Sequence, residues 1–83
     1  MAKIKVFVSL KKGILDPQGK AVESALSHLG YNDVANVRIG KYITFEMKNK
    51  SKDKMEKQIK DMAKKLLANV VIEDFTYKIE KKT

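Results

Sequence analysis

The segment from Leu15 to Lys20 determines where the first helix of this 83-residue chain begins. The carboxylate of Asp16 can accept hydrogen bonds from the free backbone N–H groups of a first helical turn, and Pro17 fits the first helical position, where a missing N–H costs nothing. Gly19 is a poor helix former, so its presence in a first turn indicates that another backbone or a partner protein packs closely there. A capped helix with an incidental glycine is the simpler interpretation of the same residues.

Apolar spacing divides the rest of the chain into strands and a second helix. Residues 3–10 alternate polar and apolar side chains, as a half-buried strand does, and residues 34–48 and 70–80 are also predicted to be extended. The helix over residues 18–29 has an apolar face that should lie on a sheet. A second amphipathic helix begins near Asp53 and ends at Asn69. Its predicted core stripe consists of Met55, Ile59, Met62, Ala63, Leu66 and Leu67.

Gly40 leaves two element orders open. The Gly40-Lys41 pair is either the turn of a hairpin, which gives the order βαββαβ, or a bulge in one long bent strand, which gives βαβαβ. We favour two strands. Either order predicts a single α+β domain over residues 1–83, of the ferredoxin-like kind, with both helices on one face of an antiparallel sheet. The candidates for the other face are Phe7, Tyr42 and Val71, so we expect a homodimer or tetramer that forms through the sheet.

Size and composition favour the same oligomer. A chain of this length buries a thin core, and without cysteine it has no disulfide to compensate, so oligomerisation or docking onto a larger partner should supply the missing stability. The absence of cysteine also fits a reducing compartment. The alternating N-terminus is unlike a signal peptide, and no apolar stretch approaches the ~18 residues of a membrane span. We therefore expect a cytoplasmic protein that does not bind membranes.

The residue combinations of an active site are missing from the sequence. The one histidine, His28, falls at the end of a predicted helix beside Leu29, where no nucleophile and base can be assembled. The ten acidic residues are scattered without the spacing of a metal site, and the four glycines lie too far apart for a phosphate-binding loop. We expect no catalytic residue, no bound cofactor and no metal.

The formal charge of +8 raises the question of nucleic-acid binding. Residues 48–65 contain eight lysines and three acidic residues, a net charge of +5 in one segment. These lysines fall on the polar face of the second helix, where a solvated face is the commoner meaning of such a pattern. The sequence also lacks the aromatic and glycine-rich signature of an RRM, so nucleic-acid binding is the weaker interpretation.

Four segments in combination resemble the PurS family, the small subunit of phosphoribosylformylglycinamidine synthase in de novo purine synthesis. They are VFVSLK at 6–11, LDPQG at 15–19 followed by AV and AL at 21–22 and 25–26, VRIGKY at 37–42 and KLLANVVIEDF at 65–75. The resemblance therefore covers nearly the whole chain. The segment around 50–60 departs from it by being richer in lysine.

The resemblance implies a division of labour among three subunits. A glutaminase subunit releases ammonia, and a large synthetase subunit uses ATP and Mg²⁺ to join that nitrogen to formylglycinamide ribonucleotide. The small subunit would bind no cofactor and bridge the other two, so that ammonia does not escape to solvent. Arg38 can make a two-pronged contact that lysine cannot reproduce, although an ordinary exposed ion pair is the alternative. The residues predicted to contact a partner or to hold the oligomer together are Asp16, Gln18, Gly19, Arg38, Gly40 and Lys41.

Two other classes of protein share features with this sequence. A small-molecule regulatory module of the ACT kind has the same βαββαβ order and dimerises, but it usually accompanies a catalytic domain in the same chain. A basic nucleic-acid-binding domain would show a salt-dependent affinity for DNA or RNA. A pull-down from cell extract that recovers a glutaminase and a synthetase with this chain would distinguish a bridging subunit from these two other classes.

Overall fold

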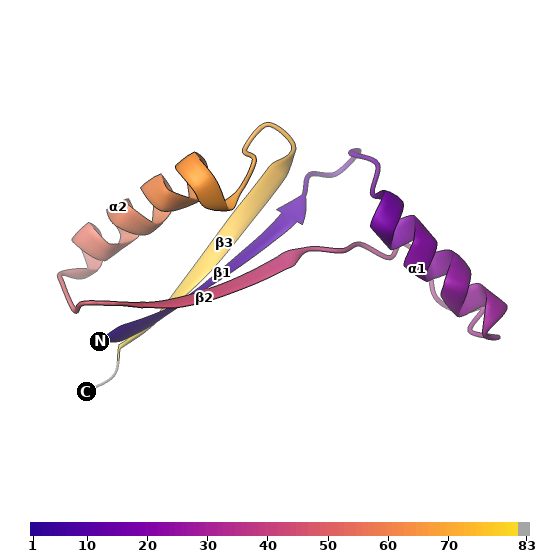
Figure 1. The fold of residues 1–83 in the computed structure, drawn as a ribbon, viewed down its shortest axis with the longest axis horizontal. Coiled ribbons are helices and arrows are strands. Elements are labelled where there is room, and N and C mark those ends of the chain that lie inside the picture. Colours follow the sequence, from indigo (N-terminus) through magenta and orange to yellow (C-terminus); the bar gives the residue numbers. More distant parts are fainter. Residues whose placement is uncertain (82–83) are drawn as a thin grey trace.

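The computed structural model describes residues 1–81 and shows a three-stranded antiparallel sheet with two helices (Figure 1). The elements are β1 (Ala2–Leu10), α1 (Pro17–His28), β2 (Lys41–Met47), α2 (Lys52–Met62), a π-helical turn η1 (Ala63–Leu67) and β3 (Glu73–Lys81). The strand order is β2-β1-β3, so the first strand lies in the middle. The α+β class and the antiparallel sheet are confirmed.

The core lies between the sheet and α2. Alternate side chains of β1 are buried, with Ile4 facing Phe45 of β2 and Ile79 of β3 across the ladder. Met55 and Ile59 of α2 are fully buried in the same cluster. The half-buried strand and the amphipathic helix were both expected from the spacing of their apolar residues.

The segment before β2 shows that the favoured element order, βαββαβ, is wrong. Residues 34–40 form no strand, so the structure has the order βαβαβ, with one strand that begins at Lys41. The physical reason lies in the hydrogen bonds of this segment. The backbone N–H groups of Val37 and Ile39 donate to side chains of Glu23 and Asp16 instead of to a neighbouring strand.

The position of α1 differs from the expectation that both helices cover one sheet face. Figure 1 shows α1 beyond the end of the strands, on the opposite side of the molecule from α2. The apolar face of α1 is therefore open, with Val22 40% and Leu29 73% exposed. Oligomer formation through the sheet stays a prediction.

The predicted core stripe is wrong at one residue, because Leu66, which follows α2 in η1, is 83% exposed. The N–H of Ala68 donates to the carbonyl of Ala63 at 2.9 Å, which is the i→i+5 bond of a π-helical turn. This wider turn holds one residue more than an α-helical turn. Leu67 and Ala68 therefore take the inward positions, and Leu66 turns to solvent.

The second sheet face is uncovered, as expected. Phe7 of β1 and Tyr42 of β2 stack on it with ring centroids 4.9 Å apart and an interplanar angle of 20°. Both rings remain accessible, with Phe7 40% and Tyr42 58% exposed.

Candidate functional site

The six candidate residues come together where the sheet meets α1. Two segments lie side by side there, residues 11–16 leaving β1 and residues 36–40 returning to β2. We call this region the joint. Hollows of about 270 Å³ and 280 Å³ lie against it, the first lined by Asp16 and Arg38 among others, the second by Asp16, Gln18, Gly40 and Lys41.

Asp16 ties the two segments of the joint together. One carboxylate oxygen accepts from the N–H of Gly19 at 2.8 Å, which caps α1 as predicted, and the other accepts from the N–H of Ile39 at 2.8 Å. These hydrogen bonds, that of Ile39 most of all, and the nearby charge of Arg38 lower the pKa of Asp16 below its usual value. The side chain is therefore an ionised acceptor at neutral pH, and it is the one buried charged residue among residues 1–80, whose side chains the structure describes.

Two glycines allow the backbones in the joint to approach. A Cβ added at Gly19 would lie 2.2 Å from the backbone oxygen of Val37, and one added at Gly40 would lie 2.6 Å from that of Val8. The close backbone packing expected at Gly19 is confirmed, and the segment that packs there belongs to the same chain. The interpretation of Gly19 as incidental is thereby excluded.

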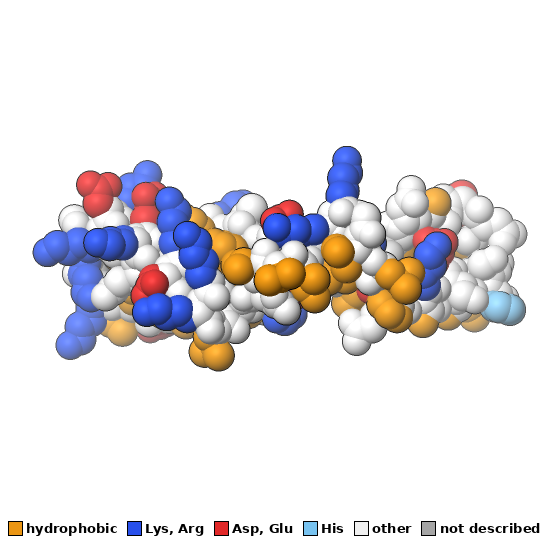
Figure 2. Space-filling view, turned by 90° about the horizontal axis from the view of Figure 1, so that it is seen from above, with side chains coloured by type: hydrophobic (Ala, Val, Ile, Leu, Met, Phe, Trp, Pro, Cys, Tyr) orange, Lys and Arg blue, Asp and Glu red, His pale blue; other side chains and the backbone are white. Residues whose placement is uncertain are grey.

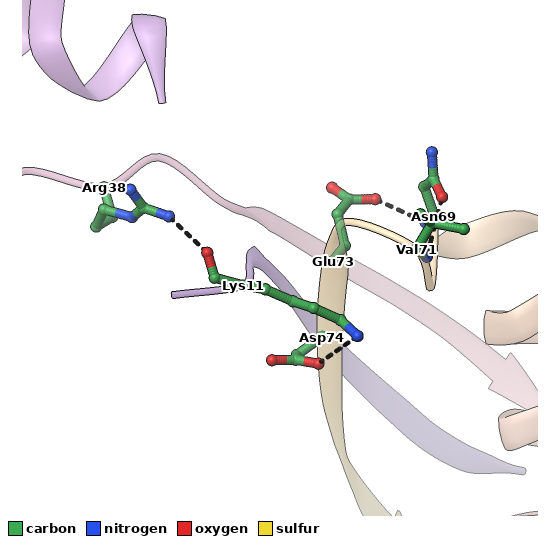
Figure 3. A network of polar contacts seen from close by, with 6 residues as sticks. All are labelled: Lys11, Arg38, Asn69, Val71, Glu73 and Asp74. Carbon is green, nitrogen blue, oxygen red and sulfur yellow. Dashed lines mark hydrogen bonds and ion pairs between the residues drawn. The ribbon is translucent and has the colours of Figure 1, made fainter. Parts of the chain in front are cut away.

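Arg38 makes a two-pronged contact within its own chain. Its guanidinium donates to the carbonyl of Ile14 at 3.0 Å and to that of Lys11 at 3.1 Å, the second of which is drawn in Figure 3. The geometry matches the prediction for an arginine, but the acceptors are backbone oxygens instead of a carboxylate. Arg38 has no ion pair within residues 1–81, and its contact with a partner stays a prediction.

Three residues that contact the joint, Glu23, Leu67 and Glu73, were missed by sequence reasoning. Glu23 of α1 accepts from the N–H of Val37 at 3.1 Å. Lys41 donates to the carbonyl of Leu67 at 3.1 Å and lies 3.8 Å from the carboxylate of Glu73, so the joint is also connected to the end of η1 and the start of β3. These contacts join residues 14 to 32 positions apart, and no local pattern in the sequence marks them.

The side chains at the joint do not form a cluster suited to catalysis or metal binding. His28 lies at the end of α1 with Nδ1 2.8 Å from the carbonyl oxygen of Ser24, away from the six candidate residues. Among residues 1–81, no group of three or more His, Asp or Glu side chains is placed to hold a metal ion. Within the same residues, no helix has the length and apolar character that crossing a membrane requires. The joint can orient α1 and present a surface, and location in the cytoplasm stays a prediction.

Comparison with known proteins gives one consistent family. A family model described as PurS, phosphoribosylformylglycinamidine (FGAM) synthase, matches residues 3–81. The phosphoribosylformylglycinamidine synthase subunit PurS of Bacillus subtilis is 50% identical over 80 residues, which cover 96% of this chain and 94% of that protein. A crystal structure of B. subtilis PurS superposes with a TM-score of 0.89 at 49% identity, covering 98% of this chain and all of that one. A chain in the structure of PurLQS from Thermotoga maritima matches with a TM-score of 0.84 at 27% identity, covering 94% and 95% of the two chains.

Proposed function

This chain belongs to the PurS family, and from that membership we propose that it is the small subunit of phosphoribosylformylglycinamidine synthase in de novo purine synthesis. The observation that carries the proposal is the match along nearly the full length of both chains, at up to 50% identity. The similar chain within PurLQS of T. maritima supports a role inside an assembly of several subunits. The chain would bridge a glutaminase subunit and a synthetase subunit so that ammonia passes between them.

The shape of the molecule suits a bridge. It measures 49 × 29 × 15 Å, with α1 at one end and α2 at the other (Figure 1). Two separate surfaces can therefore contact different partners at the same time. The partner synthetase would use ATP and Mg²⁺, whereas this chain would supply no reacting group. Ammonia that escaped to water at neutral pH would become protonated and lose its nucleophilicity, so the assembly itself would be the contribution to catalysis.

We also propose that a second copy of the chain covers the apolar face of α1. An isolated helix of 12 residues is marginal in water, and α1 has an open apolar face away from its own sheet. A dimer or tetramer that covers this face supplies the packing that the thin core lacks.

Val22→Asp should convert this oligomer to monomer. Val22 is 40% exposed, so if the chain is always a monomer the change should alter the free energy of unfolding by no more than about 0.5 kcal/mol. If Val22 lies in an interface between two copies, the aspartate would bury an unpaired charge there. Sedimentation velocity at micromolar concentration measures the outcome. Ser24→Asp on the polar side of the same helix is the control, and a wild-type chain that sediments as a monomer would refute the proposal.

The bridging function predicts a selective defect for Arg38→Lys. The exposed members of the joint, Gln18, Arg38, Gly40 and Lys41, are proposed to contact a partner, while the buried Asp16 and Gly19 hold their backbone in place. The ammonium group of a lysine cannot span both carbonyls that the guanidinium contacts. The loss of one charged hydrogen bond corresponds to a roughly tenfold change in an equilibrium constant.

The measurement is the reconstituted activity of the complex with glutamine or with ammonia as nitrogen donor. Arg38→Lys should lower the glutamine-dependent activity about tenfold and largely spare the ammonia-dependent one, with exposed Lys12→Arg as the control. Equal loss of both activities, or loss of neither, would remove Arg38 from the site. If the wild-type chain did not support glutamine-dependent activity, the proposed function itself would fail.

A further inference from the structure

Residues 14–39 form a lobe that stands apart from the core. We call this segment, which contains α1 and the chain that returns toward β2, the lobe. Among residues 1–80, the hydrophobic core draws its side chains from the strands, α2, η1 and Ala68, and none from the lobe. Figure 1 shows the lobe beyond the end of the strands, joined to them by two connections. Its position therefore depends on those connections instead of on packing in the core.

The lobe is held together by its own contacts. The carboxylate of Asp16 accepts from the N–H groups of Gly19 and Ile39, both at 2.8 Å, and so joins the start of α1 to the returning chain. Glu23 accepts from the N–H of Val37 at 3.1 Å one turn further along the helix. The returning chain also packs directly against Gly19, where a Cβ would meet the backbone oxygen of Val37. These contacts would keep the two parts of the lobe together if the lobe moved.

The lobe has few contacts with the sheet. Among residues 1–80, one side-chain hydrogen bond links the two, from Arg38 to the carbonyl of Lys11 at 3.1 Å (Figure 3). Arg38 is exposed, so water can replace this bond when the lobe moves. In the first connection, Gly13 has a φ of +86° and nothing within 4 Å of an added Cβ. Hinges are a few residues of this kind that absorb large changes of backbone angle.

The space and the charge around the lobe leave its angle free to change. A hollow of about 280 Å³ lies between the lobe, at Pro17 and Gln18, and the end of the sheet, at Leu10 and Glu73. The lobe contains two basic and three acidic residues, a net charge of −1, so the rest of the +8 chain carries +9. Figure 2 shows lysines and arginines gathered over the end opposite the histidine, which lies in the lobe. The lobe can therefore approach the sheet without repulsion between like net charges.

We propose that the lobe pivots as a rigid body about its two connections, at Gly13 and Gly40, and that the hydrogen bond from Arg38 to Lys11 holds its angle. The angle sets the distance between α1 at one end of the molecule and α2 at the other. The pivot therefore lets the two ends adapt to surfaces at different separations. This inference does not rest on the proposed function, because it concerns the chain alone.

Pulsed electron paramagnetic resonance between two spin labels measures the angle of the lobe. The chain contains no cysteine, so Ser24→Cys on α1 and Lys57→Cys on α2, both exposed, provide the two labelled positions. An excess of unlabelled chain restricts the signal to distances within one chain. Arg38→Met, which keeps an unbranched side chain without donors, should widen the distance distribution at least about twofold, because the bond that holds the angle is lost. Exposed Lys12→Met beside the hinge is the control and should leave the width unchanged.

Two further measurements separate pivoting from unfolding. The N–H groups of Val37 and Ile39 should exchange hydrogen as slowly in Arg38→Met as in wild type, because their acceptor carboxylates move with them. Labels at Lys57 and Val71, both outside the lobe, should keep their distance distribution in the same variant. Faster exchange, a wider Lys57–Val71 distribution, or an α1–α2 distribution as narrow in Arg38→Met as in wild type would overturn the pivot.

Discussion

Gly19→Ala is expected to lower the free energy of unfolding by roughly 3 kcal/mol, although alanine is the better helix former. At an ordinary helical position the same change would raise stability by about 1 kcal/mol. Here the new Cβ would lie 2.2 Å from the backbone oxygen of Val37, and a backbone atom cannot move aside as a flexible side chain can. Displacing that segment would also strain the hydrogen bond from Ile39 to Asp16, which is 2.8 Å long.

Urea unfolding at a fixed chain concentration measures this effect, because an oligomer makes the apparent stability depend on concentration. Ser24→Ala on the same helix is the control and should be neutral or slightly stabilising. Gly30→Ala provides a second comparison, since Gly30 has a φ of +98° but nothing within 4 Å of an added Cβ. A gain in stability for Gly19→Ala would show that the return segment does not pack against the first turn of α1 as described.

Ile59→Ala should destabilise the chain by about 3 kcal/mol, whereas Leu66→Ala should change stability by no more than about 0.5 kcal/mol. Both residues lie on the same apolar stripe when the sequence is read with helical spacing. Ile59 of α2 is fully buried in the core cluster that also contains Ile4 and Val6, and its truncation leaves a cavity in that cluster. Leu66 is turned outward by the π-helical turn, so its truncation removes little packing.

The pair of variants tests the register of the helix end directly. If α2 continued as a regular helix, Leu66→Ala would cost as much as Ile59→Ala, and that result would contradict the outward position of Leu66.

Local patterns were sufficient for much of the fold and for the location of the candidate site. Alternation placed β1, and the Asp16-Pro17 pair placed the start of α1, because strand and helix periodicity and helix capping are set by neighbouring residues. The glycine in the first turn signalled a close backbone approach. The six candidate residues, picked from two separate segments, come together in the joint. That they contact a partner stays a prediction.

The sequence by itself determined most of the helices and strands, the α+β class and the family, since these depend on spacing and on motifs that are contiguous in the chain. Only the tertiary structure decided where α1 lies, that residues 34–40 form no strand and that Leu66 faces solvent. Each of these depends on hydrogen bonds between distant residues or on a change of helical pitch. Asp16 and Glu23 bind the backbone of residues 37–39, and the Ala63 carbonyl bonds to Ala68 instead of to Leu67. A pattern of apolar residues records which side chains prefer burial, but it does not record which acceptor a backbone N–H will find.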